Sequence, residues 1–280
     1  MRKVWALFQG ERALFFTGLF GLGLSAVCFA AMAKHGILIE PEGHLEKAAT
    51  FDAAMGIFLL TLALIAPSAG FSRGGGRIWR FSLVGLALFG YSVETVQVFR
   101  GLDPRFSRVG TTADQVLGGV FFLSAVGIMI CFIVLTLRFF FRSTDDRDGP
   151  LVLALRYGSV AALLAFGIGI AMSVRGSPRV AEAGNLLPLH AAGFHGLQAV
   201  PLVALFFRWA GRSLEDARAS VHLAGILWLV ACVAIAFQSF GGYSLFEPSV
   251  ASALALLALG AWAVLFTRAA RAWKAAGAAW

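Results

Sequence analysis

Charged residues are scarce in this chain, and their scarcity argues against an ordinary soluble domain. They make up 14% of its 280 residues, whereas soluble domains hold about 25%. Hydrophobic residues account for 59% of the chain, and its mean hydropathy is +0.81. This composition is typical of a protein that lies in a membrane.

Cysteine and histidine are also few, which narrows the metal and redox chemistry open to the chain. The three cysteines lie in apolar stretches, and none has a partner at the C-x-x-C spacing. We interpret them as small buried hydrophobic residues. The five histidines include no pair four residues apart and no H-E-x-x-H motif. On these grounds we expect no cofactor, with haem or a transition metal as the alternative.

Long apolar stretches dominate what remains. Each of eight stretches is long enough to cross a bilayer, since a helix needs roughly 20 apolar residues to span the hydrocarbon core. The predicted fold class is therefore all-α: a polytopic integral membrane protein with a bundle of about eight transmembrane helices. The expected spans are 13–34, 49–70, 78–99, 115–139, 151–174, 186–209, 220–240 and 249–268.

The basic residues between these spans predict the orientation. With the N-terminus in the cytoplasm, 16 of the 23 Lys and Arg residues fall on the inner side and 7 on the outer side. This excess agrees with the positive-inside rule, and the opposite orientation would invert it. We therefore predict a plasma (inner) membrane protein with both termini cytoplasmic. The same distribution explains the net charge of +8 without a nucleic-acid partner.

A charged, turn-rich stretch separates the fourth and fifth spans. We predict one transmembrane domain over 1–280, in which an inner loop at 143–149 joins two four-helix halves, 1–142 and 150–280. Four spans in each half permit a parallel internal repeat, but the two halves show no evident sequence similarity. The glycines at 74–76 are interpreted as a short flexible turn on the inner side.

The third span carries ionisable and amide groups that are costly in lipid and are therefore functional candidates. At 100° per residue, Glu94 and Gln97 share a face with the small residues Ala87, Gly90 and Gly101. Such a face is expected to pack against other helices. Three further charged residues are expected at the outer mouth of this span: Arg100, Asp103 and Arg105.

The sixth span repeats this pattern at a similar expected depth. His195 and Gln198 share one face, and His190 lies elsewhere around the helix, nearer the outer surface. Pro188 and Pro201 are expected to kink this helix. The predicted site is a polar pocket open to the outside, between the third and sixth spans. Its residues are Glu94, Gln97, Arg100, His190, His195 and Gln198, with Asp52 and Gln238 as further members.

These residues favour a proton-coupled transporter of a small solute. Glu94 would carry the proton, His195 would relay it, and Arg100 and Arg105 would attract an anionic substrate. The expected partners are the lipid bilayer and a small-molecule substrate, and a homo-oligomer or a membrane complex stays open. A competing interpretation is that the polar groups only join helices by hydrogen bonds.

A second class of function stays open beside transport. A membrane-embedded enzyme, or a redox subunit that binds a metal or haem, would use His190, His195 and Glu94. Whether the protein is an enzyme is therefore undecided by its sequence. A third class is a non-catalytic assembly or sensor subunit, whose partners would bind to the faces of its helices.

Overall fold

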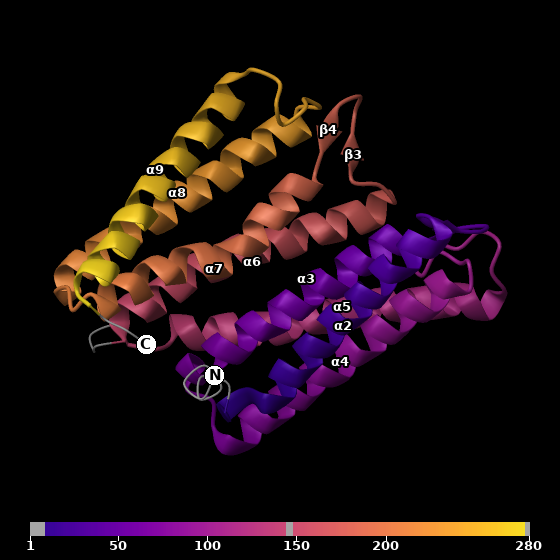
Figure 1. The fold of residues 1–280 in the computed structure, drawn as a ribbon, viewed down its shortest axis with the longest axis horizontal. Helices are drawn as coiled ribbons and strands as arrows, with labels where there is room; N and C mark the ends of the chain where they lie inside the picture. The colour runs from indigo at the N-terminus through magenta and orange to yellow at the C-terminus, as the bar shows by residue number, and fades with distance from the viewer. Residues whose placement is uncertain (1–8, 144–147, 278–280) are drawn as a thin grey trace. The chain divides into compact units, whose positions relative to one another are not determined.

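The computed structural model describes residues 9–143 and 148–277, so that 144–147, in the predicted inner loop, lie outside the described residues. It confirms the all-α class: eight of its helices are long and apolar enough to cross a membrane (Figure 1). They are α2 (Arg12–His35), α3 (Leu45–Ile65), α4 (Arg73–Phe99), α5 (Thr112–Phe140), α6 (Gly149–Arg175), α7 (Leu187–Trp209), α8 (Leu214–Phe240) and α9 (Val250–Ala275).

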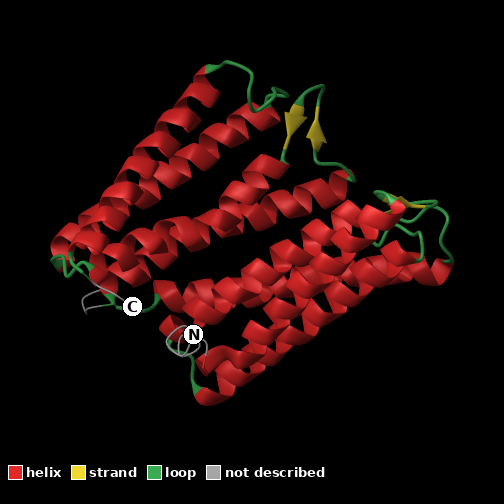
Figure 2. Ribbon diagram, in the orientation of Figure 1, coloured by secondary structure: helices red, strands yellow, loops and turns green. Residues whose placement is uncertain are grey.

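The remaining regular elements are short (Figure 2). Two antiparallel hairpins interrupt the described helices, and each strand has two residues. They are β1 (Leu38–Ile39) with β2 (Gly43–His44), and β3 (Arg179–Val180) with β4 (Gly184–Asn185). Two 3-10 helices, η1 (Gln9–Glu11) and η2 (Ala66–Ala69), flank the long helices of the N-terminal part.

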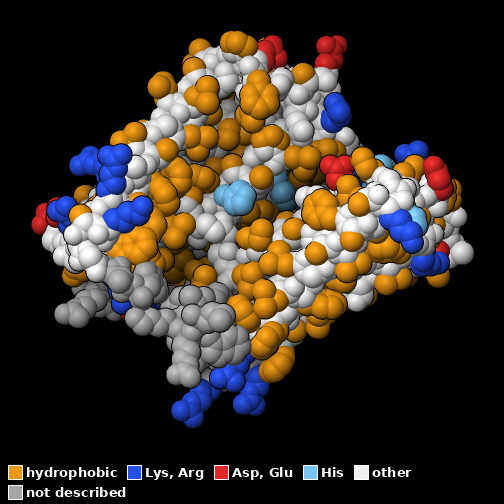
Figure 3. All heavy atoms as spheres, viewed as in Figure 1, with side chains coloured by type: hydrophobic (Ala, Val, Ile, Leu, Met, Phe, Trp, Pro, Cys, Tyr) orange, Lys and Arg blue, Asp and Glu red, His pale blue; other side chains and the backbone are white. Residues whose placement is uncertain are grey.

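The surface of the helices suits lipid. Large apolar side chains stay exposed along them, and Ile78, Phe237 and Leu256 are each more than 70% exposed. On the face shown in Figure 3, hydrophobic side chains cover the flanks of the helices, and most charged side chains lie toward helix ends. This distribution fits a protein whose surrounding solvent is hydrocarbon.

Contacts between residues divide the chain into two compact units, Met1–Leu135 and Thr136–Trp280. Unit 1 holds α2, the β1–β2 hairpin, α3, α4 and most of α5. Unit 2 contains a small last part of α5, and then α6, the β3–β4 hairpin, α7, α8 and α9. Apart from this last part of α5 and the two 3-10 helices of unit 1, the order of elements in the two units is the same: helix, hairpin and three further helices.

The first two helices of each unit cross at a pair of glycines. A Cβ built on Gly18 would lie 2.9 Å from the carbonyl oxygen of Gly56, and one built on Gly158 would lie 2.7 Å from that of Gly196. The backbones are therefore close enough that only glycine fits, as in other membrane helix pairs. These crossings join α2 to α3 and α6 to α7.

The hairpins and the third helices also match. In each unit a glycine, Gly43 or Gly184, lies where a Cβ would collide with a carbonyl oxygen near the end of α4 or α8. Both of these helices have 27 residues, and a serine caps the N-terminus of each, Ser72 in α4 and Ser213 in α8. The two halves, which show no evident overall similarity in sequence, therefore share residues at these positions. The shared residues are single glycines and N-cap serines. The separation along the sequence between corresponding residues is one residue longer for the hairpin glycines than for the glycines at the helix crossings.

Two local predictions also change. Gly74–Gly76 form the first turns of α4 and not a loop, because the Ser72 hydroxyl accepts the backbone N–H of Gly75 at 3.2 Å. Pro188 lies in the first turn of α7, where proline needs no hydrogen-bond donor. The helix continues through Pro201.

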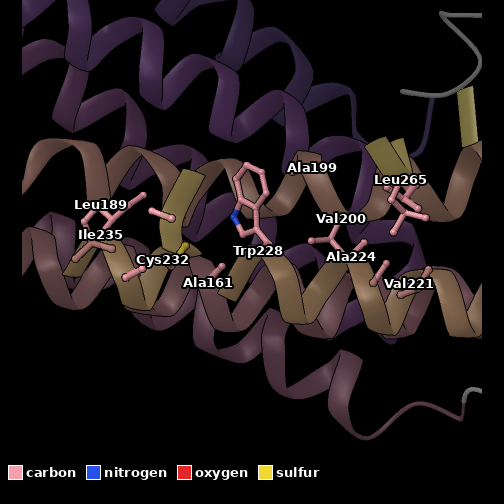
Figure 4. Packing of buried hydrophobic residues seen from close by; sticks show 14 of the residues in the cluster. Ala161, Leu189, Ala199, Val200, Val221, Ala224, Trp228, Cys232, Ile235 and Leu265 are labelled. Carbon is pink, nitrogen blue, oxygen red and sulfur yellow. The ribbon is translucent and has the colours of Figure 1, made fainter. Parts of the chain in front are cut away.

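A tryptophan from the third helix fills the core of unit 2. Trp228 lies among Ala161, Ala199 and Val200 (Figure 4), and its indole N–H donates to the carbonyl of Ala192 at 3.0 Å. In unit 1, Trp79 donates to the carbonyl of Cys131 at 2.8 Å and joins α4 to α5. Each donation satisfies a buried indole N–H that lipid cannot satisfy.

We expect Gly18→Ala to destabilise the protein, because the new methyl group would overlap the Gly56 carbonyl and the Leu60 side chain. Overpacking of this kind costs about 1–3 kcal/mol. The matched control is Gly23→Ala on the same helix, where a Cβ meets nothing within 4 Å. Thermal unfolding in detergent should show a lower Tm for Gly18→Ala alone. Equal Tm values for the two variants would contradict the crossing.

Candidate functional site

The buried charges of unit 1 centre on Glu94 of α4. Its side chain is 0% exposed, and its Oε2 lies 2.8 Å from Nη2 of Arg105. Within the described part of the chain, neither carboxylate oxygen of Glu94 has a hydrogen-bond partner, so its contact with Arg105 is an ion pair. A carboxylate in this position is costly unless its charge is compensated. Arg105 supplies that compensation.

Arg105 reaches Glu94 from the loop between α4 and α5. The carboxylate of Asp103 accepts the backbone N–H groups of Arg105 at 2.8 Å and of Phe106 at 2.9 Å, which turns the loop. The guanidinium then lies 5.5 Å from the ring centroid of Phe51 on α3 and 5.4 Å from that of Phe121 on α5. Cation–π contacts of this kind stabilise an arginine away from water.

A second carboxylate, Asp52 of α3, is buried beside this ion pair. Its side chain is 0% exposed, and its Oδ2 accepts the hydroxyl of Thr95 at 3.1 Å. Its Oδ1 and the hydroxyl of Tyr91 have no hydrogen-bond partner among the described residues. Asp52 and Glu94 are close enough to interact electrostatically. Two buried carboxylates therefore lie near each other, and in the described chain Arg105 pairs with Glu94 alone.

Gln97 has its own partners at the C-terminal end of α4. Its Nε2 donates to Oδ1 of Asp114 at 3.0 Å, and Nη1 of Arg100 donates to the same oxygen at 2.7 Å. Arg100 also donates to the amide oxygen of Gln97. The other oxygen of Asp114 accepts the backbone N–H and the hydroxyl of Thr111. This network ties the end of α4 to the start of α5.

In unit 2, Gln238 of α8 corresponds to Gln97 of α4. Gln238 of α8 donates to the carbonyl of Ser244 at 2.7 Å and to that of Glu247 at 2.9 Å, and its amide oxygen accepts the hydroxyl of Ser249, the N-cap of α9. Three residues before this glutamine, where α4 has Glu94, α8 has the buried Ile235. The glutamine thus holds helix ends in both units, whereas the buried ion pair belongs to unit 1.

The predicted residues of the sixth span lie in unit 2. Nδ1 of His190 is 2.8 Å from the carbonyl oxygen of Ala165, and its ring contacts Phe194 edge-on. His195 is exposed and Gln198 is half-buried. The contacts of Glu94 and Gln97 that the structure gives are within unit 1. A pocket shared by the third and sixth spans therefore stays a prediction.

The sequence alone pointed to Glu94 and Gln97, because ionisable and amide groups are rare in a span. It also placed Asp52 near the predicted pocket, but it gave no reason to rank this residue above the histidines. It placed Arg105 at the outer mouth, and the structure brings its guanidinium inward to Glu94.

No protein family, curated protein or solved structure matches this chain in the comparisons. Among the described residues, no group of three or more His, Cys, Asp and Glu side chains is placed to hold a metal ion. A haem or metal site that uses His190, His195 and Glu94 stays a prediction. A Soret band or a stoichiometric metal that is lost on His190→Ala would establish it.

Glu42, in the turn of the first hairpin, holds the Arg105 loop from outside the span. Its carboxylate accepts the hydroxyl of Ser107 at 2.7 Å and the backbone N–H of Arg108 at 3.0 Å. These hydrogen bonds lower the pKa of Glu42 from its ordinary 4.5, because they favour the charged form. The stability that they contribute is therefore present above pH 4.5 and is lost as the pH falls through the lowered pKa.

We expect Glu42→Gln to loosen this loop at neutral pH, because the amide is a weaker acceptor than the carboxylate. Hydrogen exchange of the amides at 105–108 should be faster than in the wild type at the same pH. The difference should shrink below the lowered pKa of Glu42. Glu182→Gln in the second hairpin is the control, since Glu182 is exposed. Unchanged exchange in Glu42→Gln at neutral pH would show that Glu42 does not hold the loop.

Proposed function

We propose that this protein is a proton-coupled transporter of a small solute in the plasma membrane, with both termini in the cytoplasm. One observation carries the proposal. Asp52 and Glu94 are fully buried carboxylates on two different spans, and the one ion pair that the described residues give either of them joins Glu94 to Arg105.

The balance of charge supports a bound proton. With both carboxylates ionised and one guanidinium present, the interior of unit 1 would hold one uncompensated negative charge. A buried uncompensated charge is expensive, and such a group neutralises by taking up a proton. Asp52 is the natural acceptor, because Arg105 compensates Glu94 and the Oδ1 of Asp52 has no partner among the described residues.

A purely structural role explains this arrangement less well. Hydrogen bonds between membrane helices contribute only about 0.6 kcal/mol on average. Ionisable groups buried in spans, by contrast, mark proton relays and substrate pathways. Unit 2 keeps the same order of elements with Ile235 in the position of Glu94. The scaffold therefore does not require the carboxylate, which supports a functional reason for its presence.

The other predicted residues have places in this proposal. Gln97 and Arg100 lie at the outer end of the third span and would contact the solute as it enters. His190, His195 and Gln198 are the polar groups of the sixth span, and they would be further polar positions for the solute in unit 2. Proton uptake belongs to Asp52 and Glu94 in unit 1.

We expect Asp52→Asn and Glu94→Gln to abolish coupled proton movement, because neither amide takes up a proton at physiological pH. The measurement uses proteoliposomes that contain a pH-sensitive dye. Inward gradients of small carboxylates, amino acids and sugars are imposed in turn, and the solute that acidifies wild-type vesicles is used for the variants. The initial rate should fall by at least about tenfold.

Glu46→Gln is the matched control, since Glu46 is an exposed acid in the first turn of the same helix as Asp52. It should keep the wild-type rate. Wild-type proton movement in both Asp52→Asn and Glu94→Gln would rule out the carboxylate pair as the proton site.

A further inference from the structure

We propose that Arg105 binds the carboxylate of a small monoanionic solute, which replaces Glu94 on the guanidinium when Glu94 takes up a proton. This inference rests on the proposed transport function and adds the chemical class of the solute. The starting point is the ion pair itself, in which Nη2 of Arg105 lies 2.8 Å from Oε2 of Glu94.

In the structure, the carboxylate of Glu94 pairs with the guanidinium of Arg105. A carboxylate solute would offer the guanidinium the same chemical group. Guanidinium binds carboxylates through a planar fork of N–H donors, and it stays protonated at any physiological pH. Within the described residues, the side chain of Arg105 has no other acidic partner. The site therefore has one permanent positive charge and one carboxylate that a proton can neutralise.

The charges balance when proton and anion arrive together. In the resting state, the Glu94 carboxylate and the Arg105 guanidinium sum to zero. When Glu94 binds a proton, it becomes a neutral carboxylic acid, and the guanidinium is left with an uncompensated charge. A bound monocarboxylate restores the zero sum, so one proton and one anion enter with no net charge. Loss of the proton then returns Glu94 to Arg105 and releases the anion.

The surroundings of Arg105 favour a solute with an apolar body. The rings of Phe51 and Phe121 lie within 5.5 Å of its guanidinium carbon. The Arg105 side chain is 31% exposed, whereas Glu94 is 0% exposed, so the guanidinium is the more accessible member of the pair. The geometry suits a carboxylate on the cation with a hydrocarbon group against the rings.

Arg100 is a poorer candidate for this role. It shares Asp114 with Gln97 and Thr111, and this network holds α4 to α5. A solute that displaced Asp114 from Arg100 would therefore break an ion pair and would also disturb the junction between α4 and α5. Arg105 is attached to the bundle through Glu94 and two rings, and a carboxylate solute replaces the first of these contacts directly.

Other charged and titratable groups also influence Glu94. They are Cys28 from α2, Lys47 and Asp52 from α3, and Asp103 and Arg105 from the loop, whereas Tyr91 of α4 interacts with Asp52. Of these, Asp52 changes the balance most directly, because it is a second buried carboxylate. In this proposal the proton that Glu94 takes up passes through Asp52, which then takes up the next one, so that both carboxylates are needed for proton movement.

The test is direct binding of benzoate and acetate to the purified detergent-solubilised protein by titration calorimetry, across a range of pH. We expect benzoate to bind the wild type more tightly at acidic than at neutral pH, and acetate to bind more weakly than benzoate. Arg105→Gln should weaken benzoate binding at acidic pH by more than about tenfold, since one partner of a buried charge pair is removed. Arg179→Gln, which removes an exposed arginine of the second hairpin, should leave it unchanged.

Glu94→Gln gives a second, independent arm that does not depend on the folding of the Arg105 variant. A neutral glutamine imitates the protonated acid, so benzoate should bind this variant at neutral pH with the affinity that the wild type shows only at acidic pH. Wild-type benzoate affinity in Arg105→Gln overturns the proposal. Unaltered pH dependence in Glu94→Gln overturns it too, as does a wild type that binds neither anion at any pH.

This experiment separates the anion site from the transport function. Benzoate binding that follows Arg105 and Glu94, together with wild-type proton movement in Asp52→Asn and Glu94→Gln vesicles, would keep the anion site and refute proton-coupled transport. Proton movement that depends on Asp52 and Glu94, without benzoate or acetate binding, would keep transport and refute the anion site.

Discussion

The ion pair between Glu94 and Arg105 is the interaction on which the end of unit 1 around the loop after α4 depends. The fully buried Glu94 is not tolerable as an unpaired charge in a low-dielectric interior, and in the described chain Arg105 is the partner that lies at ion-pair distance from it. Glu94 therefore draws the loop after α4 inward, and Asp103 and Glu42 shape that loop from outside. The ends of α3, α4 and α5 meet around the buried charge.

Most of the fold follows from the sequence, because the bilayer imposes its own length on each helix. The eight apolar stretches predicted the eight helices, and the structure differs mainly at their ends. The helices α4 and α8 begin earlier than expected, since Ser72 and Ser213 cap polar first turns that hydropathy alone assigns to loops. Backbone capping, which depends on one hydroxyl, is weakly visible in a hydropathy pattern.

The site was only partly predictable, for a geometric reason. Glu94 is conspicuous because an acid in a span is rare, whereas Arg105 looks like an ordinary loop residue. Its inward direction depends on how Asp103 turns the loop and on the space between two rings. Asp52 becomes a strong functional candidate only because Glu94 lies near it on another helix. Spacing along one helix predicts shared faces, but it does not predict which helices will meet.

The uneven distribution of charge between the two similar units has a consequence for stoichiometry. A duplicated scaffold would ordinarily offer two equivalent sites, and ligand binding to two such sites within one chain allows cooperativity. Here the position of Glu94 is filled by Ile235 in the second unit. Each polypeptide therefore carries one ionisable centre of this kind in its described part. A saturation curve for one chain should then be hyperbolic, and any sigmoidal response would have to arise between chains.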